Sequence, residues 1–170
     1  MRVIFFAIIA IFPALSMATS ARIVDLKELQ DLSQLVVVGS SVSRQSFWEG
    51  SRIYTRVDVK VEQVWHGTLQ VNSTIPVKLL GGVLNNVGQS VAGEPTLPQG
   101  QRFVLCLVES KGFYYPVGMW QGIFNIKETP TGETVQPSGV ESGHLGPRLD
   151  RLPVDLRDLR GMFDEARRAP

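Results

Sequence analysis

SRIYTRVDVKVEQVWH, residues 51–66, alternates between two kinds of side chain over most of its length. The odd positions carry mostly apolar side chains, namely Ile53, Thr55, Val57, Val59, Val61 and Trp65. The even positions carry polar ones, namely Arg56, Asp58, Lys60, Glu62 and His66. This period of two predicts one long antiparallel strand with one face on a core and the other in water. Because a straight exposed edge of that length invites aggregation, we expect the strand to curl round a small core.

Further strands are predicted on both sides of this stretch. Their apolar runs lie at residues 35–43, 73–80, 102–109, 113–119 and 121–128. The run 102–109 is apolar on both faces and is therefore expected at the centre of the sheet. Residues 44–50 are expected to form a turn or loop, and the Gly-rich residues 81–101 a long loop that includes a short hairpin. Gly39 predicts a bulge or bend in the first strand.

Helices are predicted at both ends of the β region. Apolar side chains recur every three or four residues in 24–34 and in 154–168, which is the spacing of an amphipathic helix. Residues 129–152 show no period and predict a loop or linker. The sum is a mainly β fold, a small antiparallel barrel of five or six strands with short N- and C-terminal helices. We expect the barrel domain over 22–128 and the C-terminal helix over 153–170.

The N-terminus has the order of a secretory signal peptide over residues 1–21. Arg2 precedes ten apolar residues at 3–12, and small residues then offer cleavage before Thr19 or before Arg22. The alternative, a membrane anchor, needs about 20 apolar residues, more than residues 3–18 supply. We therefore expect a secreted or periplasmic protein with no stable membrane insertion after cleavage.

The composition of the chain excludes several classes of protein. Its 17 Lys and Arg against 16 Asp and Glu leave no basic excess for holding nucleic acid by bulk electrostatics, so no nucleic-acid partner is expected. The 44% hydrophobic content is that of a globular chain. A single Cys excludes an internal disulfide framework and a zinc site built on several thiolates.

The reactive side chains form no catalytic or metal-binding pattern. Cys106 lies between leucines, where a buried thiol acts as a small hydrophobe. Neither His66 nor His144 has a second histidine at ligand spacing. Ser90, in GQSVA at 88–92, resembles a nucleophile elbow, but no helix follows it. We therefore expect no enzyme, no metal and no cofactor.

Two acidic side chains on one strand face also favour a structural role. Asp58 and Glu62 share the polar face of residues 51–66, with Lys60 between them and Arg56 beside them. A solvated face with cross-strand pairs explains this pattern better than a catalytic dyad.

Aromatic residues are the remaining signal. Trp combines a large contact area with a hydrogen-bond donor, so tryptophans near turns and strand ends are candidates for recognition. Core packing is the default interpretation of Trp65. The candidate binding surface is the 81–101 loop with its neighbouring strand ends, and its residues are Trp48, Trp65, His66, Gly81, Gly82, Trp120 and Gln121.

The order of short motifs resembles a known family. The motifs are VEQVWHG at 61–67, PVKLLGG at 76–82 and PQGQRFVLCL at 98–107. Over residues 24–128 the chain resembles uncharacterised secreted bacterial proteins and, more remotely, the netrin-like domain of tissue inhibitors of metalloproteinases. The resemblance implies an OB-like five-stranded barrel. Those inhibitors chelate the protease zinc through an N-terminal Cys, which this mature N-terminus lacks, so their inhibitory residues carry over to no position here.

Three functions follow from these patterns. The leading hypothesis is an exported noncatalytic binding or interaction module for a protein or peptide partner. One alternative is a peptidase inhibitor that inserts the 81–101 loop or the N-terminal arm into the cleft of a secreted protease. A second alternative is a small hydrolase that uses Ser90 or His66.

Overall fold

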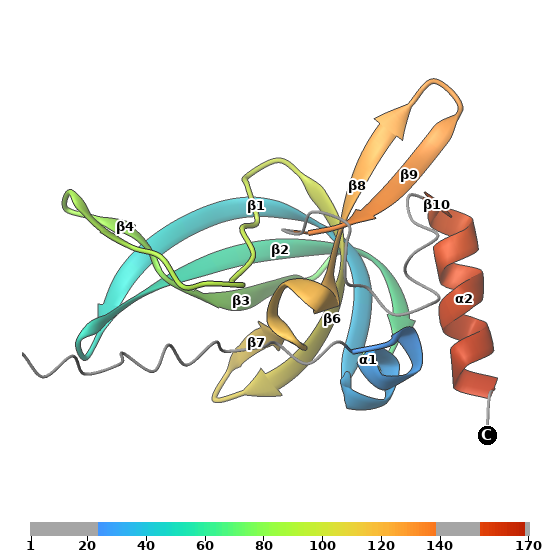
Figure 1. Cartoon of the computed structure of the whole chain (residues 1–170), viewed down its shortest axis with the longest axis horizontal. Helices are drawn as coiled ribbons and strands as arrows, with labels where there is room; N and C mark the ends of the chain where they lie inside the picture. Colours follow the sequence, from blue (N-terminus) through green and yellow to red (C-terminus); the bar gives the residue numbers. More distant parts are fainter. Residues whose placement is uncertain (1–23, 139–153, 169–170) are drawn as a thin grey trace, which may run out of the picture.

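The computed structural model describes residues 24–138 and 154–168 (Figure 1). Its strands are β1 (Leu35–Glu49), β2 (Arg52–His66), β3 (Thr74–Leu80), β4 (Gly82–Leu84), β5 (Val87–Gln89), β6 (Arg102–Ser110), β7 (Phe113–Pro116), β8 (Ile123–Thr129), β9 (Gly132–Pro137) and β10 (Val154–Asp155). Its helices are α1 (Leu26–Leu32), the short 3-10 helix η1 (Met119–Gly122) and α2 (Leu156–Arg168). The predicted signal peptide, residues 1–21, lies outside the described residues.

Eight of the strands form one mixed sheet in the order β1-β2-β3-β7-β6-β8-β9-β10, while β4 and β5 form a separate hairpin. Because β1 also pairs with β6, the strands β1, β2, β3, β7 and β6 close a ring. The predicted mainly β fold with a short helix near each end is confirmed (Figure 1). The prediction of an all-antiparallel arrangement is wrong at one place, since β3 and β7 run parallel and meet at Val77 and Tyr114.

The alternation of apolar and polar side chains in residues 51–66 is confirmed in β2. Its side chains at positions 53, 57, 59 and 61 are fully buried, and those at positions 56 and 60 are exposed. β2 pairs antiparallel with β1 along almost its whole length. The register shifts between Val38 and Gly39, where a Cβ on the glycine would crowd the Lys60 carbonyl. The bulge predicted at Gly39 is therefore present.

Residues 44–50 are not the predicted loop, because β1 continues to Glu49. The extension pairs with the first part of β2 and is held by side chains across the strands. The ring of Phe47 stacks on Tyr54 at 6.1 Å, and the buried Lys78 ammonium lies 4.2 Å from the centre of the Tyr54 ring. Lys78 also pairs with Glu49 at 2.6 Å. These contacts are set by cross-strand neighbours, so apolar periodicity within residues 44–50 gives no sign of them.

Residues 129–152 are not a loop or linker throughout. Residues 132–137 form β9, which pairs with β8 on one side and with β10 on the other. Most residues of β9 are polar, and Val135 is its one buried side chain. Residues 139–152 lie outside the described residues. The predicted C-terminal helix is present as α2, preceded by β10.

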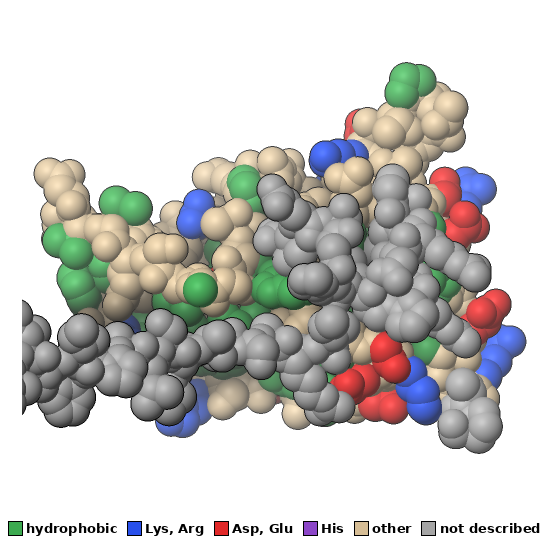
Figure 2. Space-filling model, viewed as in Figure 1, with side chains coloured by type: hydrophobic (Ala, Val, Ile, Leu, Met, Phe, Trp, Pro, Cys, Tyr) green, Lys and Arg blue, Asp and Glu red, His purple; other side chains and the backbone are tan. Residues whose placement is uncertain are grey.

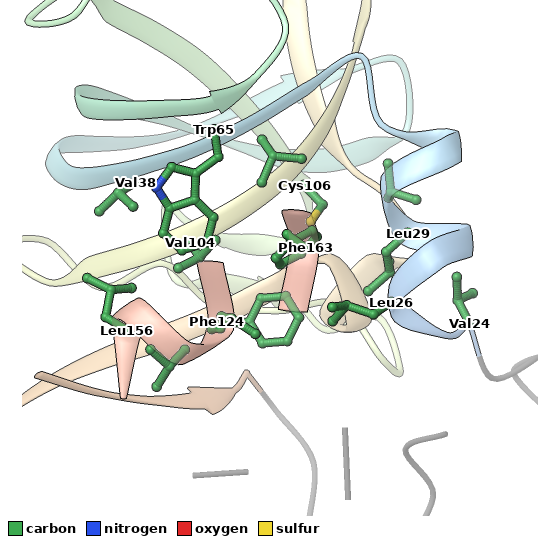
Figure 3. Close-up of a cluster of buried hydrophobic side chains, with 14 residues drawn as sticks. Val24, Leu26, Leu29, Val38, Trp65, Val104, Cys106, Phe124, Leu156 and Phe163 are labelled. Atoms are coloured by element: carbon green, nitrogen blue, oxygen red, sulfur yellow. The ribbon is translucent and has the colours of Figure 1, made fainter. Parts of the chain in front are cut away.

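Residues 35–39 of β1 and residues 103–107 of β6 are buried on both faces of the sheet, which creates two cores. In β6, Phe103 and Leu105 point into the core enclosed by the ring, whereas Val104 and Cys106 point into a second core. The expected central position of residues 102–109 is confirmed, since β6 pairs with β1, β7 and β8. Figure 3 shows the second core, where α1 and α2 pack on the sheet.

Helix α2 anchors this second core through Phe163. The Phe163 ring lies 5.9 Å from Trp65 and 6.3 Å from Phe124, edge-on to the latter. At one end of α2, the Arg167 guanidinium donates to the Trp65 carbonyl oxygen at 2.9 Å. The predicted burial of Cys106 and the core interpretation of Trp65 are both confirmed.

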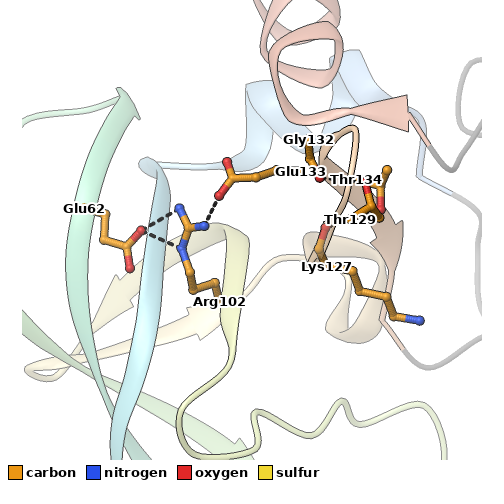
Figure 4. A network of polar contacts seen from close by, with 7 residues as sticks. All are labelled: Glu62, Arg102, Lys127, Thr129, Gly132, Glu133 and Thr134. Carbon is orange, nitrogen blue, oxygen red and sulfur yellow. Dashed lines mark hydrogen bonds and ion pairs between the residues drawn. The ribbon is translucent and has the colours of Figure 1, made fainter.

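An arginine joins three strands near the second core (Figure 4). Arg102 of β6 donates from Nε and Nη2 to one carboxylate oxygen of Glu62 in β2, both at 2.8 Å, and from Nη1 to Glu133 in β9. Asp58 forms an ion pair with Arg56 of the same strand at 2.8 Å and accepts a hydrogen bond from Ser43 of β1 at 2.7 Å. The two carboxylates Asp58 and Glu62 thus form the predicted cross-strand contacts.

Candidate binding site

The loop between β3 and β6 begins with two glycines whose backbone only glycine adopts easily. Gly81 and Gly82 have φ angles of +81° and +139°. A Cβ on Gly82 would overlap the hydroxyl oxygens of Thr55 and Ser46. The absence of a side chain therefore lets the chain leave β3 and lie directly against β1 and β2.

The β4–β5 hairpin that follows is closed by Asn85 and Asn86, with φ angles of 51° and 62°. Positive φ at both central residues is the geometry of a tight two-residue hairpin turn, and asparagine accepts it readily. The short hairpin predicted within residues 81–101 is thus present.

Backbone and side-chain hydrogen bonds fix the hairpin on β2. The Gly81 amide donates to the Ile53 carbonyl at 2.8 Å, and the Ile53 amide donates to Gln89 Oε1 at 2.6 Å. The Thr55 hydroxyl donates to the Gly81 carbonyl at 2.8 Å. The hairpin is consequently held against a buried strand rather than left to move in water.

The second half of the loop is fixed by a carboxylate and by an apolar anchor. Glu94 accepts a hydrogen bond from the Leu80 amide at 2.5 Å, and Leu97 is fully buried in the core of the ring. Burial raises the pKa of Glu94, although the Leu80 hydrogen bond opposes this shift. The half-buried carboxylate of Glu94 therefore lies in the loop on the side that faces the β4–β5 hairpin.

A groove lies between the β4–β5 hairpin and residues 90–96, with a volume of about 450 Å³. We call it the hairpin groove, and its lining includes Thr55, Leu79, Gly82, Gln89, Ser90 and Glu94. The lining mixes hydroxyl, amide, carboxylate and apolar groups. Such a surface can hold a polypeptide by hydrogen bonds and by apolar contact together.

Exposed apolar side chains surround the hairpin. Val83 is 71% exposed, Val87 49% and Trp48, at the end of β1, 47%. Trp48 stands opposite Ile53 in the register, beside the strand that Gln89 contacts. Figure 2 shows hydrophobic side chains gathered at this end of the molecule. Clusters of this kind on a surface mark contact sites for partners.

Three of the predicted site residues belong to the 81–101 loop or contact it. Gly81 and Gly82 are its first two residues, and Trp120 contacts it. The two glycines line the hairpin groove. The Trp120 amide donates to the Gly93 carbonyl at 3.3 Å, and its indole lies in contact range of Gly93. Trp120 is also partly buried against the second core, so it supports the loop from behind.

Trp48 lies beside the hairpin, whereas the remaining predicted residues, Trp65, His66 and Gln121, lie elsewhere. Trp65 and His66 end β2 beside α2, and Trp65 lies twelve positions from Ile53, roughly 40 Å along the strand at the usual rise. Gln121 is 4% exposed, and its side-chain oxygen accepts from the Val24 amide at 2.7 Å. Trp65 and Gln121 are buried, and the structure does not join them or His66 to the loop.

Sequence reasoning missed the polar groups of the hairpin groove. Glu94, Gln89 and Thr55 come from a loop, a hairpin and a strand, and no motif connects them. The signal that pointed near them was the length and glycine content of residues 81–101.

The two candidate hydrolase residues are not brought together. Ser90 is exposed beside the hairpin groove, whereas His66 lies at the opposite end of β2. Within residues 24–138 and 154–168, no three His, Cys, Asp or Glu side chains gather as metal ligands. In the same residues, no helix has the length and apolar character needed to cross a bilayer. Neither the protein-family models nor the curated proteins gave a match to this chain.

Proposed function

We propose that the chain is an exported, noncatalytic binding module that holds an extended segment of a protein or peptide partner in the hairpin groove. The observation that carries this proposal is a groove of mixed lining, about 450 Å³ in volume, on a loop that is hydrogen-bonded to the ring at Ile53 and Leu80. A preorganised surface loses little conformational entropy on binding, which favours affinity.

The proposal includes an OB-like barrel for the ring. Five strands in the order β1-β2-β3-β7-β6, closed by the β1–β6 pair, support it. A peptidase inhibitor remains the alternative function. The exposed apolar side chain of Val83 favours this alternative, because a projecting hairpin suits insertion into the cleft of a protease. The groove itself supports binding more than the barrel does, since a fold alone does not define a function.

Export is supported by the order of charged, apolar and small residues in 1–21. Mass spectrometry of the protein from its native cells tests it directly. We expect a mature chain that begins at Thr19 or at Arg22. A chain that retains Arg2 in the membrane fraction contradicts export with cleavage.

Capture experiments test the binding surface. The purified protein is immobilised, proteins retained from the native export compartment are identified by mass spectrometry, and the best partner is titrated against variants. Ser90→Arg fills the hairpin groove with a long charged side chain, and we expect at least a tenfold loss of affinity. Ser110→Arg makes the same change at an exposed site outside the groove, at the end of β6, and should bind as the wild type does.

The outcomes of this titration separate the candidate functions. Equal affinity of both variants contradicts binding at the hairpin groove. A captured peptidase that loses activity in the complex would assign the inhibitor alternative. Labelling of Ser90 by a fluorophosphonate probe would contradict the noncatalytic assignment and support the hydrolase.

A further inference from the structure

The outer edge of β1 is open over residues 43–49. These residues pair with β2 on one side, while the pairing of β1 with β6 covers only residues 35–40. At one end the open edge stops where Gln99 donates to the Val42 carbonyl at 3.0 Å, and at the other it stops at the turn into β2. Its midpoint is Ser46.

The register shows which backbone groups face this edge. The amide and carbonyl of Ile53 are both used by the loop after β3, so they point away from β1. Trp48, which is opposite Ile53, is therefore a non-hydrogen-bonded partner, and its own amide and carbonyl point outward. Strand alternation gives the same orientation to Ser46 and Arg44, opposite Thr55 and Val57.

Three residues thus present an amide and a carbonyl each along a single line. Among the residues that the structure describes, none donates to or accepts from these groups of Arg44, Ser46 and Trp48. A row of unpaired donors and acceptors of this kind is a template for another strand. Natural sheets usually protect such edges from further strand pairing, or pair them with another strand.

We propose that this edge pairs with the same edge of a second copy of the chain, antiparallel about a two-fold axis at Ser46. This register places Ser46 opposite Ser46 of the second copy and Arg44 opposite Trp48 of the second copy. All three pairs join outward-facing residues, and each such pair exchanges two hydrogen bonds, so about six form. The two sheets become one continuous sheet.

Side chains in this register are complementary to themselves. Arg44 is exposed, and it makes no ion pair within residues 24–138 and 154–168. Its guanidinium meets the exposed indole of Trp48 on the same sheet face, a cation–π contact made twice in a dimer. On the other face Gln45 stands opposite Phe47, and Ser43 opposite Glu49. No like charges oppose each other, so two copies of this edge can pair in this register without charge repulsion.

The β4–β5 hairpin adds apolar surface at the same edge. Gly82 lies against Ser46, and Figure 1 shows the hairpin crossing β1 and extending past it. Val83 and Val87 are exposed there. A second copy at the β1 edge would stand next to these side chains and cover apolar surface that is otherwise in water.

Sedimentation equilibrium of the purified protein tests the pairing. We expect twice the monomer mass at high micromolar concentration. Trp48→Arg places an arginine opposite Arg44 of the second copy at two points, so the dimer dissociation constant should rise about tenfold. Val71→Arg is the matched control, because Val71 is 46% exposed and lies outside β1, in the turn between β2 and β3. It should leave the dissociation constant unchanged.

A charge swap tests the register itself. Arg44→Glu combined with Trp48→Arg puts opposite charges across the two-fold axis, and the dimer should tighten relative to Trp48→Arg alone. Positions 44 and 48 lie about 13 Å apart along one strand, so recovery cannot arise within one chain. Circular dichroism checks that each variant is folded. A monomeric wild type, a dimer insensitive to Trp48→Arg, or a double variant no tighter than the single one overturns the proposal.

Discussion

At the scale of single residues, Glu94 links the candidate site to the stability of the fold. Burial raises the pKa of Glu94 above its ordinary value of 4.5. A raised pKa means that the folded chain holds the proton more tightly than the unfolded chain. The resulting stabilisation is therefore present below pH 4.5 and is lost as the pH rises through the raised pKa.

Glu94→Gln should make the protein more stable than the wild type at pH 7. The amide keeps an oxygen acceptor for the Leu80 N–H and removes the poorly solvated charge. The difference in the free energy of unfolding should close as the pH falls below 4.5, as urea titrations at several pH values would show. Glu109→Gln, at an exposed site on β6, should give no such difference. A Glu94→Gln protein that is less stable at pH 7 contradicts this account.

Cys106 should be inert in the folded protein. Burial raises the pKa of its thiol to about 12, although a hydrogen bond with Ser33 opposes the shift. The nucleophilic thiolate is therefore nearly absent at pH 8. Mass spectrometry after treatment with iodoacetamide should find no adduct on the native protein and one adduct in urea. Rapid labelling under native conditions would show that the second core is open.

Residues with strong local patterns were the ones that could be predicted. Leucines on both sides of Cys106 indicated its burial, and the alternation around Trp65 indicated a core position. Glu94 could not be predicted as a site residue, because its burial depends on the loop folding back on Leu80, a contact that no local pattern encodes.

At the scale of elements, the glycine that starts the β4–β5 hairpin should be a sensitive position in the loop. Gly82→Ala adds a Cβ that overlaps Thr55 and Ser46, at a φ of +139°. We expect the free energy of unfolding to fall by about 2–3 kcal/mol in urea titrations. Gly100→Ala is the control, because Gly100 has a positive φ but open space around it, so only about 1 kcal/mol should be lost. Equal losses would mean that the hairpin does not lie on β1 and β2.

Helix α2 should depend on a single aromatic side chain. Phe163→Ala removes the contacts with Trp65 and Phe124 and leaves a cavity, which should cost about 3–5 kcal/mol of unfolding free energy. Glu165→Ala changes the exposed side of the same helix and should cost less than about 0.5 kcal/mol. If both variants unfold at the same urea concentration, α2 is not part of the second core.

Among the elements, β2 and β6 were predictable because the apolar pattern of their own residues indicates their burial. One face of β2 is buried, and both faces of β6 are buried. The extension of β1 and the strand β9 were missed for the opposite reason. Their residues are largely polar, and their strand conformation depends on partners distant in sequence or on cross-strand contacts such as Lys78 with Tyr54. Pairing of this kind overrides local propensity.

At the scale of the whole molecule, the sequence predicted a small barrel, but the strand pairing that closes the ring was beyond sequence reasoning. It requires β1 to meet β6, whose paired residues such as Val38 and Val104 are far apart along the chain, and a parallel contact between β3 and β7. Closure also separates the two ends of β2. One end carries the hairpin groove, and the other is covered by α2. The residues of the predicted binding surface are therefore divided, with Gly82 at the groove and Trp65 in the second core.

Hydrogen–deuterium exchange of the protein with and without its captured partner tests the central proposal most directly. The account predicts that the partner slows amide exchange in residues 82–96, around the hairpin groove, and leaves the Trp65 end of β2 and helix α2 unchanged. Slower exchange at Trp65, His66 and α2 with none in residues 82–96 would contradict it.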